Sequence, residues 1–437
     1  MNPDQRQPSP AAREFDPDAS FARALDRDDP LADFRGRFRI PERSDGSAVT
    51  YLCGNSLGLQ PTSAGAAIRQ ELDDWARLAV DAHFEGRTPW YSYHTVFREP
   101  TARLVGARSE EVVTMNGLTV NLHLMLVSFF RPDAQRYKVL MEENAFPSDT
   151  YAVKSHLERH GLDPDDALLV ARARHGESTL RTEDIEELIE SEGERIALVL
   201  LGGVNYYSGQ LFDLRRIAAC ARRAGCTVGY DLAHAVGNVP LSLHDWDVDF
   251  AVWCSYKYLN GGPGTVAGCF VHQRHLDDPS IPRLAGWWGN DPKKRFRMHL
   301  EPEFVPAHGA DGWQLSNPPI LALAPLRAAL ELFDQAGLQA LRQKSLGLTG
   351  YLESWVDAVG DGRVRIITPR APGARGCQIS LQVSEGSREL FDALQGQGIV
   401  GDYREPDAIR VAPVPLYNSF HDVWRFGVAL QRWSAGK

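Results

Sequence analysis

The stretch WCSYKYLNGGPG, Trp253 to Gly264, places a single lysine between two tyrosines, directly after an apolar run and before a glycine-rich turn. The apolar run FAVWC (250–254) has the length and composition of a buried strand. Lys257 therefore falls just beyond the carboxyl end of that strand. Because ligands in open α/β sheets bind at the carboxyl ends of the strands, Lys257 is a candidate functional residue.

A second polar residue ends the preceding predicted strand. Asp231 closes the run CTVGYD, and His234 follows three residues later. An aspartate and a lysine at neighbouring strand ends suit a pyridine cofactor that carries an aldehyde: the carboxylate keeps the ring nitrogen protonated, and the amine forms a Schiff base. The pair predicts pyridoxal 5'-phosphate (PLP). Two other roles stay open, Asp231 as a helix cap and His234 as a core histidine.

Apolar runs alternate with helical patterns from about residue 110 onward, the order typical of a parallel β-α-β sheet with helices on both faces. The predicted strands are 137–141, 167–171, 196–201, 226–231 and 250–254. Helix signals between them include Thr182 as an N-cap and Gly225 as a stop. A long helical region covers 316–333.

A second, smaller pattern follows this helical region. Its predicted elements are strands in 363–369, 377–383, 399–405 and 408–415, and a helix capped by Ser387. We expect an α/β protein with a large domain of mostly parallel sheet flanked by helices, plus a smaller C-terminal α+β domain. The expected segments are a disordered lead (1–20), an N-terminal segment contributing to the small domain and the site (21–100), the large PLP-binding domain (101–335) and the small domain (336–437).

Composition narrows the class of partner. The chain has 437 residues and a formal net charge of -10, so it lacks the basic surface that nucleic-acid binding requires. Its longest apolar run, 196–201, is too short to span a bilayer. The six cysteines are scattered, with no CxxC pair and no histidine at ligand spacing, which predicts neither a metal site nor disulfides. We expect a cytoplasmic protein that binds a small molecule.

The segment 115–130 offers a place for a phosphate. A turn at Asn116-Gly117 precedes an apolar helical pattern that begins near Thr119. The N–H groups of a helix N-terminus bind anions well. A buried helix without a ligand would give the same pattern, so both interpretations stay open.

Seven motifs, taken in order, carry a resemblance to a known family. They are MNGLTVNLHL (115–124), FPSD (146–149), YDLAHAVGNVPL (230–241), WCSYKYLNGGPG (253–264), GWWG (286–289), SNPPI (316–320) and IRVAPVPLYNSFHD (409–422). The chain resembles the kynureninase family, PLP enzymes of the aspartate aminotransferase fold, also called fold type I. The resemblance runs from about residue 50 to the C-terminus.

The resemblance implies a set of cofactor contacts. Lys257 would form the Schiff base, and Asp231 would pair with the pyridine nitrogen. Phe146, Pro147, Ser148 and Asp149 would lie near the ring, and Leu118, Thr119 and Tyr256 near the phosphate, with His234 beside them. The family forms homodimers with active sites at the interface, which implies that Trp287 and the pair Ser316-Asn317 serve the site of the neighbouring subunit.

The resemblance also implies the reaction, hydrolysis of the β,γ carbon–carbon bond of L-kynurenine or 3-hydroxy-L-kynurenine to L-alanine and anthranilate or 3-hydroxyanthranilate. This reaction belongs to tryptophan catabolism and can feed NAD biosynthesis. Tyr256, next to Lys257, is our hypothesis for the acid-base group at the γ-carbonyl. Arg410 would bind the α-carboxylate as a bidentate partner. The residues implied at the aromatic end of the substrate are Ser56, His83, Trp288, Ser316 and Asn317.

One departure and three alternatives accompany this interpretation. The family often has a hydroxyl residue near position 202, where this chain has Gly202, which puts one cofactor contact in doubt. A cysteine desulfurase-like lyase shares the fold but needs an exposed thiol, and Cys377 lies in a strand pattern. An aminotransferase would use the same lysine and aspartate. A non-catalytic cofactor-binding protein is the alternative from another class.

Overall fold

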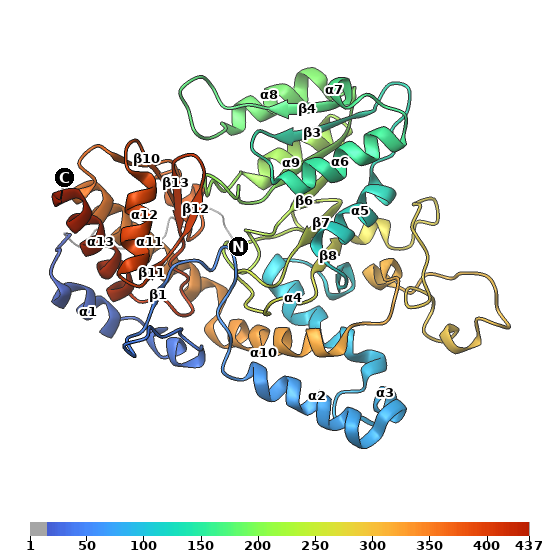
Figure 1. Cartoon of the computed structure of the whole chain (residues 1–437). Helices are drawn as coiled ribbons and strands as arrows, with labels where there is room; N and C mark the ends of the chain where they lie inside the picture. The colour runs from blue at the N-terminus through green and yellow to red at the C-terminus, as the bar shows by residue number, and fades with distance from the viewer. Residues whose placement is uncertain (1–14, 437) are drawn as a thin grey trace.

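A seven-stranded sheet forms the centre of the larger part of the molecule in the computed structural model, which describes residues 15–436. Neighbouring strands are parallel from β4 to β7, and β8 is antiparallel to both of its neighbours, β7 and β2. The mostly parallel α/β sheet expected from the sequence is thus confirmed (Figure 1). From one edge to the other the strands are β2 (Val112–Thr114), β8 (Gly268–Val271), β7 (Phe250–Trp253), β6 (Thr227–Asp231), β5 (Ile196–Gly202), β3 (Lys138–Glu142) and β4 (Leu168–Ala171).

The central strand β5 shows why this sheet forms. Its side chains alternate between two buried clusters: Val199 and Leu201 face one cluster, and Leu198 and Leu200 face the other. A strand that is buried on both faces has a continuous apolar sequence rather than an alternating one. Helices cover both faces, as expected. The first cluster includes side chains of α8 (Thr182–Glu192), α9 (Leu214–Arg223) and α10 (Ile320–Ala336), and the second includes side chains of α5 (Leu118–Phe129) and α6 (Pro147–Arg159).

A separate core holds the smaller, C-terminal part together, drawn in orange and red at the left of Figure 1. Its antiparallel sheet has the order β12-β13-β10-β9, and a short parallel pair, β1 with β11, lies beside it. The strands are β1 (Thr50–Tyr51), β9 (Val364–Ile366), β10 (Ile379–Val383), β11 (Ile399–Val400), β12 (Asp402–Arg404) and β13 (Ala408–Val411). The helices are α1 (Ala19–Arg27), α11 (Leu338–Val359), α12 (Ser387–Gly396) and α13 (Phe420–Ala435).

The N-terminal segment contacts both parts of the molecule. Helix α1 packs on α13 in the small core, whereas α2 (Ala64–Leu78) packs along α10 of the large part. The ring of Phe15 already meets Trp355 edge-on, with centroids 5.3 Å apart. The expected boundary at residue 21 therefore falls inside α1, and the expectation for residues 1–14 lies outside the described residues. Three short helices complete the chain, α3 (Ala82–Glu85), α4 (Arg98–Val105) and α7 (Pro164–Ala167).

Helix starts differ from the prediction by small amounts. Thr182 and Ser387 are the first residues of α8 and α12, and the capping positions are Arg181 and Gly386. The region predicted as helical from 316 becomes helix only at Ile320, because two prolines precede it. Within residues 15–436, no helix has both the length and the apolar character needed to cross a membrane.

Candidate active site

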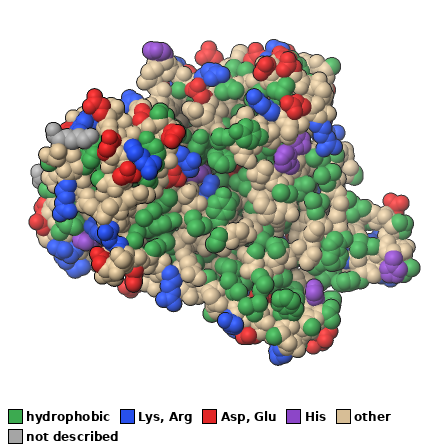
Figure 2. All heavy atoms as spheres, in the orientation of Figure 1, with side chains coloured by type: hydrophobic (Ala, Val, Ile, Leu, Met, Phe, Trp, Pro, Cys, Tyr) green, Lys and Arg blue, Asp and Glu red, His purple; other side chains and the backbone are tan. Residues whose placement is uncertain are grey.

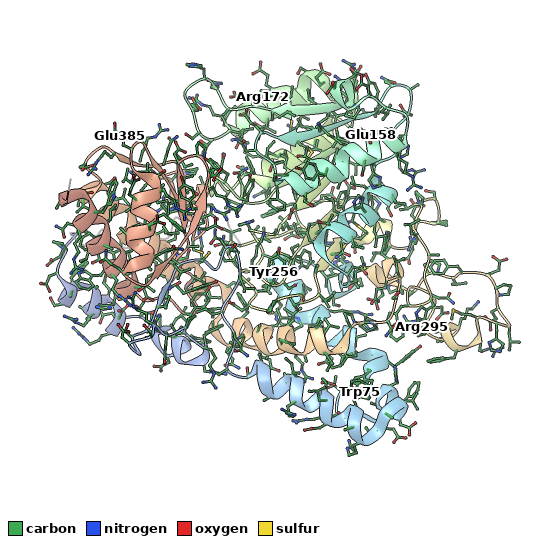
Figure 3. The ribbon with its side chains drawn as sticks, in the orientation of Figure 1. Trp75, Glu158, Arg172, Tyr256, Arg295 and Glu385 are labelled. Carbon is green, nitrogen blue, oxygen red and sulfur yellow. The ribbon has the colours of Figure 1, made fainter. Side chains whose placement is uncertain are left out.

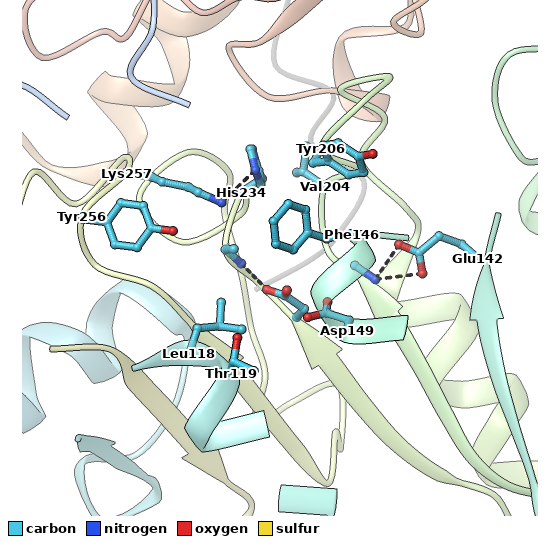
Figure 4. A pocket seen from close by; sticks show the side chains of 13 residues that line it. Leu118, Thr119, Glu142, Phe146, Asp149, Val204, Tyr206, His234, Tyr256 and Lys257 are labelled. Carbon is cyan, nitrogen blue, oxygen red and sulfur yellow. Dashed lines mark hydrogen bonds between the residues drawn. The ribbon is translucent and has the colours of Figure 1, made fainter. Parts of the chain in front are cut away.

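A pocket opens where β3, β5 and β6 end. Glu142, Gly202 and Asp231 are the last residues of these strands, and all three line the pocket. Gly202 and Asp231 are direct partners in the β5–β6 pairing. Figure 4 shows Lys257 and Tyr256 entering from one side, with Phe146, Asp149 and Glu142 on the other. The other lining residues are Leu118, Thr119, Val204, Tyr206, Ala233 and His234.

Lys257 lies in this pocket with its amine against His234. The distance from Lys257 Nζ to His234 Nε2 is 3.0 Å, and the other ring nitrogen of this buried histidine has no hydrogen-bond partner. Burial, followed by the charges of Lys257, Arg410 and Arg404, lowers the pKa of His234 well below its ordinary value. The imidazole is therefore neutral and accepts a hydrogen bond from the amine.

The turn after the lysine is built from left-handed backbone. Asn260, Gly262 and Gly264 have φ values of 56°, 89° and 73°, which explains the glycine-rich sequence. The N-terminal segment holds this turn in place. Gly58 N–H donates a hydrogen bond of 2.8 Å to the Tyr256 carbonyl, and a Cβ on Gly58 would collide with the Lys257 carbonyl oxygen.

Three carboxyl groups form the far wall of the pocket. Asp231 Oδ1 accepts a 2.7 Å hydrogen bond from the Ala233 amide, and both Glu142 oxygens accept from the Gly202 amide, at 3.1 and 3.2 Å. Burial raises the pKa of Glu142 to about 7. Asp149 is 5% exposed, its Oδ1 has no partner, and burial together with Asp231 raises its pKa well above the ordinary value.

This wall suits a cationic ring. Buried carboxyls cost free energy unless a cation or a proton compensates them, and an unpartnered oxygen beside Asp231 leaves a place for a donor. The protonated nitrogen of a pyridine ring is a donor of this kind. The residues present therefore fit PLP, with the lysine amine at the opposite side of the pocket.

The other end of the pocket offers donors for a phosphate. Helix α5 begins at Leu118 and offers the free N–H groups of its first turn, whereas in α6 Pro147 has no N–H and the Asp149 amide donates to the Phe146 carbonyl, which leaves the Ser148 amide. The hydroxyl oxygens of Thr119 and Ser148 lie 3.1 Å apart across these two turns. The position predicted for the phosphate thus coincides with two helix N-termini rather than one.

Arg410 reaches the pocket edge from the small domain. Its side chain is buried and forms a 2.5 Å ion pair with Asp402, and it donates a 2.6 Å hydrogen bond to the carbonyl of Tyr206, which lines the pocket. Ser56, predicted at the substrate, donates to the same Asp402 carboxylate at 3.3 Å. The structure thus brings Ser56 and Arg410 together around Asp402.

Nine predicted residues do not line this pocket within the described chain: Ser56, Pro147, Ser148 and Arg410, and five others that lie elsewhere. Arg295, on a loop remote from Tyr256 in Figure 3, packs over the ring of Trp288 at 4.5 Å. Trp288 is only 1% exposed in this chain. The other four are Trp287, which is 37% exposed, the exposed pair Ser316 and Asn317, and His83, whose ring meets Trp90 edge-on.

Sequence reasoning missed four lining residues. Glu142 follows a predicted strand directly, so the rule that selected Asp231 would also have selected it. Val204, Tyr206 and Ala233 come from loops, and no pattern in the sequence indicates where a loop side chain points. Gly202, which the prediction singled out as a departure, lies in the pocket wall against Glu142.

The cysteines and one histidine cluster complete the inventory of reactive groups. All six cysteines are buried, and burial raises the pKa of Cys377 to about 12. Among the described residues, Glu111, His244 and His272 place potential metal ligands within 4.8 Å of one another. One of these contacts is already a hydrogen bond, since His244 Nδ1 lies 2.9 Å from Glu111, and His272 Nδ1 accepts a hydrogen bond of 3.2 Å from the Arg274 amide outside the group. The cluster is accounted for as a structural network.

Solved structures with the same architecture define the class of the fold. The chain superposes on the cysteine desulfurase CsdA of Escherichia coli with a TM-score of 0.74 at 18% identity, over 92% of this chain and 98% of that one. It also superposes on the cystine C–S lyase C-DES with a TM-score of 0.72 at 19% identity, over 88% and 97%. The fold is that of PLP-dependent enzymes of fold type I, and PLP is the cofactor that the pocket fits.

Sequence relatives give the family within this class. Residues 341–430 match the kynureninase C-terminal domain. The chain is 56% identical to the kynureninase of Koribacter versatilis over 95% of its own length and 98% of that protein. It is also 56% identical to the kynureninase of Myxococcus xanthus over 95% and 97%. The chain therefore belongs to the kynureninase family.

Proposed function

We propose that this protein hydrolyses the β,γ carbon–carbon bond of L-kynurenine or 3-hydroxy-L-kynurenine with the help of PLP, releasing L-alanine and anthranilate or 3-hydroxyanthranilate. The main support for the proposal is that the Lys257 amine and the carboxyl groups of Asp149 and Asp231 line the same pocket. The amine lies 3.0 Å from His234. The family membership of the chain selects this reaction among those of the fold.

The residues divide the chemistry between them. PLP supplies, when bound, an electrophilic aldehyde and a ring that takes up the electron pair released at the substrate α-carbon. The Lys257 amine removes the α-proton, and Asp231 stabilises positive charge at the opposite wall. Tyr256 holds a proton for the γ-carbonyl oxygen, because burial, and then Cys254, raises the pKa of its phenol above the ordinary value. A phenol that keeps its proton at neutral pH is a proton donor.

Arg410 orients the substrate through its α-carboxylate. Its guanidinium lies at the pocket edge beside Tyr206, with the carbon Cζ 5.9 Å from the ring centroid. A guanidinium offers two parallel donors to a carboxylate, which fixes the direction of the substrate as well as its charge. The reacting carbons are thereby directed toward Lys257 and Tyr256.

The second half of the proposal is a homodimer. The loop around residues 284–300 and helix α3 expose large apolar side chains, visible among the hydrophobic groups at the lower right of Figure 2. Exposed apolar patches of this kind are typical of protein interfaces. We propose that His83, Trp287, Ser316 and Asn317, which do not line the pocket of their own chain, complete the pocket of the second subunit. The most exposed apolar side chains here are Phe84 (58%), Phe296 (59%) and Leu300 (66%).

The roles of the two domains, the location of the reaction and its pathway belong to the same proposal. Residues 101–335 would act as the PLP-binding domain and 336–437, with part of the N-terminal segment, as a small domain that carries Arg410. The reaction would take place in the cytoplasm, in tryptophan catabolism, and its hydroxylated product would feed NAD biosynthesis.

One experiment tests the activity directly. The absorption spectrum of the PLP-loaded protein is recorded before and after addition of 3-hydroxykynurenine, and 3-hydroxyanthranilate is followed by fluorescence. We expect a visible band that changes with substrate and equal amounts of alanine and 3-hydroxyanthranilate. Lys257→Ala serves as the inactive control. A stable band with no product from either kynurenine would overturn the proposal and direct attention to cysteine and amino-group acceptors.

A further inference from the structure

Two arginines, not one, surround Asp402 at the edge of the pocket. Asp402 and Arg410 are direct partners in the antiparallel pair β12–β13, and their ion pair is 2.5 Å long. Arg404, two residues along β12, contacts the same carboxylate, with Nε 2.9 Å from Oδ1 and NH2 3.2 Å from Oδ2. The carboxylate thus bridges two guanidiniums.

The charges of this group do not cancel. Two guanidiniums, which remain protonated in proteins, face a single carboxylate, so the group carries one net positive charge. Donor capacity also remains, because the buried Nε of Arg410 forms no hydrogen bond among the described residues, and Arg404 contacts Asp402 through Nε and NH2 and not through NH1. A ligand with one carboxylate would neutralise the remaining positive charge of the group and accept hydrogen bonds from its unused donors.

Arg404 lies as close to the ring of Tyr206 as Arg410 does. The two guanidinium carbons are 6.0 Å and 5.9 Å from the centroid of the Tyr206 ring, which lines the pocket. Both arginines also contribute, after burial and Lys257, to the lowered pKa of His234. Arg404 is 40% exposed at its side chain, whereas Arg410 is 2% exposed, so Arg404 is the more accessible cation of the two.

We infer that Arg404 is a second recognition residue for the substrate carboxylate, and that Asp402 is the positioning residue that holds Arg404 and Arg410 as one site. Asp402 neutralises one guanidinium and fixes the orientation of both, and Arg404 supplies the charge that remains for the ligand. The inference rests on the proposed function, which provides a substrate with an α-carboxylate, and extends it to Arg404 and Asp402.

Binding of unreactive probes separates charge recognition from catalysis. The probes are 3-benzoylpropionate, which carries the carboxylate and the aryl ketone but no amine, and its primary amide, which lacks the charge. Calorimetric titration of the PLP-loaded protein compares Arg404→Gln, Arg404→Lys and the unaltered chain. Arg365→Gln is the matched control, since Arg365 is exposed on β9, at the opposite edge of the same sheet.

We expect Arg404→Gln to weaken binding of the acid about tenfold or more, the size of one lost charge-assisted hydrogen bond, and to leave the amide within about twofold. Arg404→Lys, which keeps the charge, should recover part of the loss, and Arg365→Gln should change neither probe. Unchanged acid binding in Arg404→Gln, or equal losses for acid and amide, would overturn the inference. Failure of the unaltered protein to cleave kynurenine would instead refute the proposed function, so the two results are distinguishable.

Discussion

The Lys257 amine and the imidazole of His234 form a hydrogen bond of 3.0 Å in which the lysine donates. Because His234 is buried beside this amine and two arginines, its pKa is lowered and it stays neutral. A neutral imidazole can hold the amine without repelling it. The contact therefore fixes the lysine side chain at the pocket before any ligand enters.

Replacing Tyr256 with phenylalanine should lower kcat roughly 10²- to 10⁴-fold, the usual contribution of a positioned acid-base group, because the phenol proton is lost while the ring remains. The affinity for PLP, measured by equilibrium dialysis, should change little. Tyr258→Phe is the control, since that tyrosine is buried and does not line the pocket. Parallel losses of PLP affinity and kcat in Tyr256→Phe would count against the acid-base role.

Arg410→Lys should raise KM for kynurenine about tenfold to a hundredfold, with a smaller effect on kcat, because an ammonium group cannot reproduce two parallel hydrogen bonds. Steady-state kinetics measure both parameters. Arg365→Lys on the same sheet should leave them unchanged. A variant with an unaltered KM and a reduced kcat would show that Arg410 does not bind the substrate carboxylate.

The free energy of unfolding should depend on pH because Glu142 titrates at a different pH in the folded and unfolded states. Its pKa is about 7 in the folded protein against an ordinary value of 4.5, so the folded state binds more protons than the unfolded state between these pH values. The contribution of protonated Glu142 to the stability of the folded protein is fully present below pH 4.5 and is lost as the pH rises to 7. The free energy of unfolding therefore falls by about 3 kcal/mol over this range.

Glu142→Gln removes this titrating group while its amide oxygen can still accept from Gly202. Urea unfolding of the PLP-free variant from pH 5 to 8 should therefore show a weaker decline in stability than the unaltered chain. Glu158→Gln, on the exposed face of α6, should follow the unaltered chain. Identical pH profiles for Glu142→Gln and the unaltered chain would mean that Glu142 titrates near its ordinary pKa.

Cys377→Ala should retain kynurenine cleavage within a few-fold, because this thiol is fully buried and its raised pKa of about 12 leaves it protonated. Reaction of the folded protein with a thiol reagent should be slow for all six cysteines. Loss of activity in Cys377→Ala with normal folding would favour the desulfurase-like alternative, in which a cysteine acts directly.

The strand ends were predictable, because a parallel sheet buried on both faces has continuous apolar runs. Lys257 and Asp231 follow or end such runs, and the topology then brings them to one pocket. Helix starts were less exact: the hydroxyl residues Thr182 and Ser387 begin their helices instead of capping them, and neither Arg181 nor Gly386 has a side-chain cap.

The positions of side chains on loops were not predictable in the same way. Trp288 was expected at the substrate because of its motif, but the motif did not indicate its contact with Arg295, whose guanidinium carbon lies 4.5 Å from the centroid of the Trp288 ring. That contact depends on how the loop between the two residues folds, which has no periodic pattern in the sequence. The same reason explains why Tyr206, which borders both the pocket and the two arginines, was missed.

The pairing of β1 with β11 has a consequence for how the chain is made. Thr50 pairs with Ile399, so this N-terminal strand acquires its partner only after about 350 further residues have been synthesised. At 5–20 residues per second on the ribosome, that interval lasts roughly 20 to 70 seconds. The large sheet, whose strands all lie between these two, can assemble first. The group of Asp402, Arg404 and Arg410 on β12 and β13 becomes complete only near the end of synthesis.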